Sequence, residues 1–122
     1  MANPFSEDEI KNFLRNLKLT KYELDVYLTL LQHGPANYKE ITKLSGVPYG
    51  KIYYTLKSLA KKGWIKSING RPRIFYSADP QKPLQNYLVR IRKQMNDLEE
   101  LFQQMIPQLQ TLYKKSSIHP SF

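Results

Sequence analysis

The strongest constraint on the fold is an apolar repeat in the last third of the sequence. Apolar residues recur there at alternating spacings of four and three without interruption, at Leu84, Leu88, Ile91, Met95, Leu98, Phe102, Met105, Leu109 and Leu112. This spacing is typical of the seam of a coiled coil. With Leu84 at heptad position d, Pro107 falls at position f on the outside, where it bends the helix and leaves the seam intact.

The length of the repeat indicates that it does not pack only on its own domain. Residues 81–114 would form a helix about 50 Å long, whereas a domain of roughly 80 residues has a radius of gyration of about 12 Å. We therefore predict a dimerisation helix over residues 80–115, with these nine apolar residues, the seam residues, joining two copies of the chain. Helix direction stays open, because Met95 and Phe102 at position a do not select it.

Three helix starts precede this helix, each marked by a capping box. In such a box a Ser, Thr or Asn is followed three residues later by Glu, as at Ser6 and Glu9, Thr20 and Glu23, and Asn37 and Glu40. The apolar residues at helical spacing that follow predict three buried faces, formed by Ile10, Phe13, Leu14 and Leu17, by Leu24, Tyr27, Leu28 and Leu31, and by Ile41 and Leu44.

A fourth helix follows the third after a very short junction. Only Val47 separates Gly46, which ends one helix, from Pro48, which suits the first turn of the next. The fourth helix has an apolar stripe at Ile52, Leu56 and Leu59 and ends at Gly63. Two helices joined by so short a turn that contains Gly are typical of a helix-turn-helix.

Two predicted strands come next, over residues 64–68 and 73–77. Asn69-Gly70 favours a tight turn between them, while Pro72 indicates either an edge hairpin or a loop that extends to that residue. The predicted fold class is mainly α with a small β-hairpin. It consists of a winged helix-turn-helix domain at residues 1–79, a long C-terminal coiled-coil helix at residues 80–115 and a flexible tail at residues 116–122.

Positive charge is concentrated in the predicted helix-turn-helix and hairpin. Residues 36–76 contain nine bases and one acid, Glu40, whereas the other residues contain ten bases and nine acids. A surface that serves only solubility mixes both signs, so this distribution predicts a polyanionic partner, double-stranded DNA. The candidate DNA-binding residues are Lys39, Pro48, Tyr49, Gly50, Lys51, Tyr54, Lys57, Ser58, Lys61, Arg71 and Arg73.

Most of these candidates share the face of the fourth helix opposite its apolar stripe. The lysines there could neutralise phosphates, and the tyrosines could meet base edges or sugars. Gly50 either lets the backbone approach the duplex or is simply tolerated in a loosely packed first turn. Arg71 and Arg73 at the wing tip suit a narrow minor groove. We expect Tyr22, Tyr27, Tyr53 and Trp64, by contrast, to belong to the core.

Other classes of protein find little support in the sequence. It has no Gly-rich phosphate loop, no G-x-S-x-G motif, no cysteine and only two histidines, His33 and His119. It has no apolar run long enough to span a bilayer and no signal peptide at its start. We therefore expect no enzyme, no metal or other cofactor, no membrane association and a cytoplasmic location, and the sequence identifies no small-molecule effector.

The chain resembles the N-terminal half of the archaeal TrmB-like transcriptional regulators. The matching segments are residues 19–31, Gly34-Pro35-Ala36, residues 41–53 with Leu-Ser-Gly-Val-Pro, then Leu56, Leu59, Lys62, Gly63 and Gly70-Arg71-Pro72. The resemblance covers roughly residues 12–84 and implies DNA-binding regulation of transcription by dimers.

Two departures from the family pattern limit what is carried over. The family often has an arginine and a small polar residue where this chain has Tyr49 and Gly50, so we expect a different operator preference. Many members continue into a domain that commonly binds sugars. We expect no such domain here, because the chain ends soon after the heptads.

Three functions fit these features. The first is a homodimeric, sequence-specific regulator of transcription. The second is an architectural protein that coats DNA with little sequence preference, and the third is a protein–protein interaction module within the transcription machinery.

Overall fold

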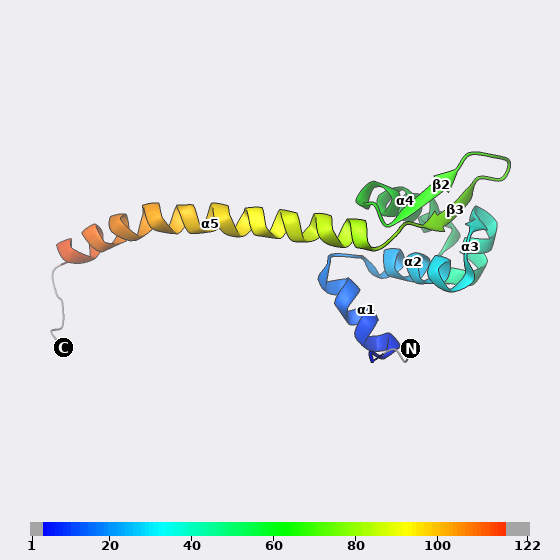
Figure 1. The fold of residues 1–122 in the computed structure, drawn as a ribbon, viewed down its shortest axis with the longest axis horizontal. Helices are drawn as coiled ribbons and strands as arrows, with labels where there is room; N and C mark the ends of the chain where they lie inside the picture. The colour runs from blue at the N-terminus through cyan, green and yellow to red at the C-terminus, as the bar shows by residue number, and fades with distance from the viewer. Residues whose placement is uncertain (1–3, 117–122) are drawn as a thin grey trace. The chain divides into compact units, whose positions relative to one another are not determined.

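The computed structural model describes residues 4–116, which contain five helices and three short strands. One compact unit extends to Gln85 and a second begins at Asn86. In the first unit the chain forms α1 (Glu7–Asn16), α2 (Lys21–His33), β1 (Ala36–Asn37), α3 (Tyr38–Ser45), α4 (Tyr49–Lys62), β2 (Ile65–Ile68) and β3 (Ile74–Ser77) (Figure 1). Helix α5 (Gln81–Lys115) starts in that unit and makes up the second. The predicted fold class is confirmed, whereas residues 117–122 of the predicted tail lie outside the described residues.

All three predicted capping boxes are present, and each starts a helix. The backbone N–H of Glu9 donates to Ser6 Oγ over 3.1 Å, that of Glu23 to Thr20 Oγ1 over 3.1 Å, and that of Glu40 to Asn37 Oδ1 over 2.9 Å. Each glutamate accepts a hydrogen bond from its cap residue in return. These bonds satisfy amide groups that a helix start would otherwise leave unpaired, which fixes where α1, α2 and α3 begin.

The short junction between α3 and α4 forms the predicted helix-turn-helix. Gly46 ends α3 with φ of +73°, a left-handed conformation that glycine adopts without strain. Val47 is buried, and its N–H donates to Ser45 Oγ over 3.2 Å. Pro48 is the N-cap of α4 and provides no side-chain hydrogen bond. This turn anchors the start of α4 on the core.

The sheet has the strand order β1–β3–β2 and is antiparallel throughout. Ile68 pairs with Ile74, so residues 69–73 form a five-residue loop and the predicted tight turn at Asn69-Gly70 is wrong. Pro72 has no N–H for a strand ladder, and the loop extends past it. Strand β1 was not predicted, because two residues are too few to show an alternating pattern. Both strands of the hairpin start one residue later than expected.

The core of the first unit lies between the helices and the sheet. The rings of Tyr27 and Trp64 meet edge-to-face there, 5.2 Å apart, as expected for two core aromatics. The expected burial of five other side chains is wrong, because Phe13, Tyr22, Leu31, Leu44 and Tyr53 are all exposed. Helical spacing identifies the inner side of a helix, but not how wide a strip its neighbours cover.

Helix α5 changes its environment soon after it starts. Pro83 is buried, and Leu84, the first residue of the predicted seam, is partly buried against the core of the winged-helix unit. From Asn86 the helix continues without a break through Pro107 to Lys115. The other eight seam residues are all exposed in the single chain.

Candidate nucleic-acid interface

The outer face of α4 combines lysines with tyrosines. Burial of Ile52, Leu56 and Leu59 turns this face outward. The predicted site residues Tyr49, Gly50, Lys51, Tyr54, Lys57 and Lys61 are exposed on α4, and Pro48 is exposed at its cap. Lys39 is exposed on α3. Helix α4 has no acidic residue, so its outer face carries positive charge alone.

The tyrosines around α4 form two edge-to-face pairs. Tyr38 and Tyr49 have ring centroids 5.7 Å apart, and Tyr53 and Tyr54 have centroids 5.4 Å apart. The Tyr38 hydroxyl donates to the backbone oxygen of Tyr49 over 3.3 Å. Tyr49, Tyr53 and Tyr54 expose between 58% and 73% of their surface, so α4 has three exposed aromatic rings as well as its lysines.

Tyr53 was missed as a site residue, although the sequence carried a signal. A helical wheel places it about 90° from the centre of the apolar stripe, on the flank of the helix. Its proximity in sequence to buried Ile52 made it look like a core residue. In the structure it joins Tyr54 on the surface instead.

A cleft of about 260 Å³ lies between α4 and the sheet. Lys57 and Arg73 both line it, so it brings the predicted lysine of α4 and the predicted arginine of the hairpin to one place. Its remaining walls are mainly aromatic or polar: Tyr38, Tyr53, Leu56, Ala60, Ser67 and Phe75. Two cations beside aromatic rings suit a sugar–phosphate segment, because the charges meet the phosphate and the rings pack on the sugar.

The hairpin loop places its two arginines in solvent. Arg71 and Arg73 are both exposed, and the Arg73 guanidinium donates to Asn69 Oδ1 across the loop. Ile68 at the end of β2 is exposed as well. The loop therefore has a basic surface with one apolar side chain at its base.

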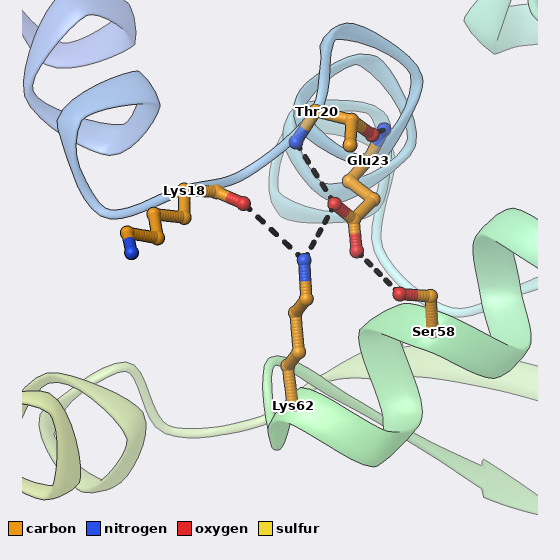
Figure 2. Close-up of polar contacts among 5 residues, drawn as sticks. All are labelled: Lys18, Thr20, Glu23, Ser58 and Lys62. Carbon is orange, nitrogen blue, oxygen red and sulfur yellow. Dashed lines mark hydrogen bonds and ion pairs between the residues drawn. The ribbon is translucent and has the colours of Figure 1, made fainter.

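Ser58 differs from the other predicted site residues. Its hydroxyl is half-buried and donates to Glu23 Oε2 over 2.8 Å (Figure 2). Glu23 Oε1 accepts from Lys62 Nζ and from the Thr20 backbone, both over 2.8 Å. Lys62 Nζ also donates to the Lys18 backbone oxygen over 3.2 Å. Ser58 thus belongs to an internal network, and we leave it out of the proposed interface.

This Glu23 network, made of Lys18, Thr20, Glu23, Ser58 and Lys62, ties the start of α2 to the end of α4. Glu23 is only 2% exposed, yet its partners satisfy it. Burial raises the pKa of Glu23, but hydrogen bonds from Lys62, Thr20 and Ser58 and the Lys62 charge outweigh burial and hold the pKa below its ordinary value of 4.5. The carboxylate therefore stays charged and fixes α4 against α2.

Within residues 4–116, no group of His, Cys, Asp and Glu side chains could hold a metal ion. No helix in the same part of the chain is long and apolar enough to cross a membrane.

Helices α3 and α4, their short turn and the β2–β3 hairpin define a winged helix-turn-helix protein. Its outer helix face is basic, as in proteins of this class that bind nucleic acid. The family model described as "Sugar-specific transcriptional regulator TrmB" matches residues 14–81, more than half of the chain. The chain belongs to this family, and the predicted resemblance is confirmed.

Individual relatives extend beyond the part that matches. The chain is 37% identical over 99 residues to the HTH-type sugar sensing transcriptional regulator TrmBL1 of Pyrococcus furiosus, covering 81% of this chain and 29% of that protein. It is 26% identical to the putative HTH-type transcriptional regulator TrmBL2 of the same organism, covering 93% of this chain and 46% of that protein. The chain thus spans less than half the length of these two relatives.

A solved structure supports the fold. The structure described as that of TrmBL2, an archaeal chromatin protein with a novel mode of DNA binding, matches with a TM-score of 0.75. The two are 22% identical, and the match covers 93% of this chain and 45% of the other. At this level of identity the similarity shows the fold alone.

Proposed function

We propose that the protein is a homodimeric regulator of transcription that binds specific sites on double-stranded DNA in the cytoplasm. The observation that carries this proposal is the outer face of α4, where exposed lysines and tyrosines occur without any acidic residue. A helix of this kind in a helix-turn-helix suits the major groove. The family and the names of its relatives also point to regulation of transcription, and they indicate no enzymatic activity.

The proposed contacts are of two kinds: contacts to phosphates, which position the protein on the duplex, and contacts to bases, which recognise the sequence. Lys39, Lys51, Lys57 and Lys61 would neutralise phosphates, with Lys57 and Arg73 holding one backbone segment in the cleft between α4 and the sheet. Bases would be read by the exposed face around the start of α4, at Pro48, Tyr49, Gly50 and Tyr54. The exposed Arg71 would reach the minor groove from the wing.

The dimer is supported by the apolar surface of α5. From Asn86 onward, eight residues of the predicted seam are exposed at coiled-coil spacing along one helix. A contiguous apolar stripe of this length is costly in water, so a second copy of the helix is its natural cover. We propose residues 86–115 as the dimerisation segment, because the first turn of α5 packs on the winged-helix core.

A second candidate function is architectural. A relative described as a chromatin protein shares this fold, and lysines that contact only phosphates would bind any sequence. The exposed tyrosines favour the regulator, because backbone neutralisation alone does not require them.

The two functions are separated by selection of bound fragments. We would bind the protein to a labelled pool of genomic fragments at about 150–200 mM salt, where purely electrostatic binding is weak. Enrichment of a few sites with two-fold symmetry is the expected result. Uniform recovery of fragments would favour the architectural function, and no binding would contradict both.

A further inference from the structure

Charge is unevenly distributed along the exposed part of α5. Three bases come first, Arg90, Arg92 and Lys93, and three acids follow, Asp97, Glu99 and Glu100. Lys93 and Asp97 pair within the helix over 3.0 Å, and Arg90 lies over the Tyr87 ring at 5.2 Å. Among the ion pairs of residues 4–116, none involves Arg92 or Glu99. Both are exposed, and both occupy heptad position e beside the seam.

We propose that α5 pairs with α5 of a second copy in the antiparallel direction, with the two-fold axis between Asn96 and Asp97. This inference rests on the dimer of the proposed function and specifies its direction and register. The apolar stripe of α5 is thus covered by α5 of a second chain, which runs in the opposite direction.

This register pairs six of the eight exposed seam residues with one another and leaves Leu109 and Leu112 beyond the paired layers. In an antiparallel pair, position a of one helix packs against position d of the other. With the axis between residues 96 and 97, Leu88 packs against the partner's Met105, Ile91 against the partner's Phe102 and Met95 against the partner's Leu98. Symmetry repeats each layer, so the seam has six layers. All of these side chains are exposed in the single chain and would be covered by the pair.

Charge selects this register over its neighbours. Positions e of the two helices flank each other in an antiparallel pair, so Arg92 lies beside the partner's Glu99, twice per dimer. A shift of one heptad in one direction would place Arg92 beside the partner's Arg92. The opposite shift would place Glu99 beside the partner's Glu99. Both shifts replace attraction by repulsion, which disfavours them.

The parallel pair lacks these contacts. There, position e flanks position g, so Arg92 would meet the partner's Tyr87 and Glu99 would meet the partner's Gln94. The basic segment of one helix would also lie beside the basic segment of the other, and the acidic segment beside the acidic segment. Only the antiparallel pair joins opposite charges across the seam. It also places the first turns of the two α5 helices at opposite ends of the pair, about 45 Å apart.

Cysteine cross-linking tests the direction, because the chain contains no cysteine of its own. We would prepare Leu88→Cys and Met105→Cys separately, verify by light scattering that each is dimeric when reduced, and oxidise each alone and after subunit exchange. The antiparallel register predicts no cross-link in either variant alone and a Leu88→Cys to Met105→Cys cross-link in the mixture. Cross-linking of each variant with itself would overturn the proposal in favour of a parallel pair. A monomeric wild type would instead overturn the dimer itself.

A charge reversal tests the register without altering the seam. Arg92→Glu should weaken dimerisation about tenfold, since two exposed pairs become repulsive, and Arg92→Glu combined with Glu99→Arg should restore it. Arg90→Glu is the matched control, because position c faces away from the seam, and it should change dimerisation much less. Failure of the double reversal to restore the dimer would overturn the register.

Discussion

The two units of the chain use their apolar side chains in opposite ways. The winged-helix unit buries a core within itself, from Leu14 to Ile65. The part of α5 from Asn86 onward exposes nearly all of its large apolar side chains. The first unit can therefore fold with its own residues, and its exposed face is basic and aromatic. The second has an exposed apolar face, which in our account requires a second chain.

The largest expected effect is a loss of dimerisation caused by a substitution in α5 alone. Leu98→Asp puts a charge in the middle of the proposed seam of both chains. It should weaken dimerisation by at least about three orders of magnitude, because each chain loses a leucine that the proposed dimer would bury and the pair would bury a charge instead. Light scattering should report monomers at tens of micromolar.

The winged-helix unit provides its own control for this variant. Trp64 is the sole tryptophan, and it is buried in that unit, so its fluorescence should be unchanged by Leu98→Asp. A shifted emission spectrum would show that the two units do not fold separately, and a stable dimer would contradict the proposed seam.

The next effect concerns the basic face. Lys57→Ala and Lys61→Ala should each weaken binding to every duplex and reduce the slope of log affinity against log salt by about one unit per lost phosphate contact. Lys21→Ala removes an exposed lysine from α2, outside the proposed interface, and serves as the matched control. An equal loss in the control would show that net charge, rather than the face of α4, binds DNA.

The sequence predicted where the helices lie better than it predicted which of their side chains are buried. Capping boxes and the Gly46–Pro48 junction are local hydrogen-bonding and backbone rules, so they located α1 to α4 well. The heptad repeat likewise located α5. The width of each buried helix face was harder to predict from the sequence, because it depends on neighbours distant in sequence. Leu31, Leu44 and Tyr53 were expected to be buried and are exposed.

The same reason explains why the sequence did not indicate the hydrogen bond between Ser58 and Glu23. Thr20 and Glu23 are only three residues apart in sequence and were paired correctly. Their links to Ser58 and Lys62 cross 35 and 39 residues, a separation at which no local pattern points to a partner. A half-buried hydroxyl on α4 therefore looked available for DNA until its partner was known.

The Glu23 network should make the stability of the winged-helix unit depend on pH. Its pKa is lowered on folding, so the charged form stabilises the fold above pH 4.5, and this contribution is lost as pH falls through the folded-state value. Glu23→Gln should lower the free energy of unfolding by about 1–3 kcal/mol at neutral pH, because buried hydrogen bonds lose their charge. Urea denaturation followed by Trp64 fluorescence should show this difference shrinking toward pH 3. A difference independent of pH would contradict the charged state of Glu23.

The smallest effect distinguishes two reasons for Gly50. A Cβ there would meet nothing within 4 Å, so the fold has room for Gly50→Ala. The substitution should raise the free energy of unfolding by up to about 1 kcal/mol through helix propensity. If the backbone approaches DNA closely, the same variant should bind its site more weakly although it is more stable. Unchanged binding would show that Gly50 is merely tolerated.

The central claim is that DNA binds the outer face of α4 and the adjacent hairpin loop. The most direct test is a titration of the isotopically labelled protein with a duplex, followed by NMR shifts of the backbone amides. Our account predicts the largest shifts at residues 49–61 and 69–73, with small changes in α1 and in the exposed part of α5. Shifts concentrated in α1 or α5, with residues 49–61 unaffected, would contradict it.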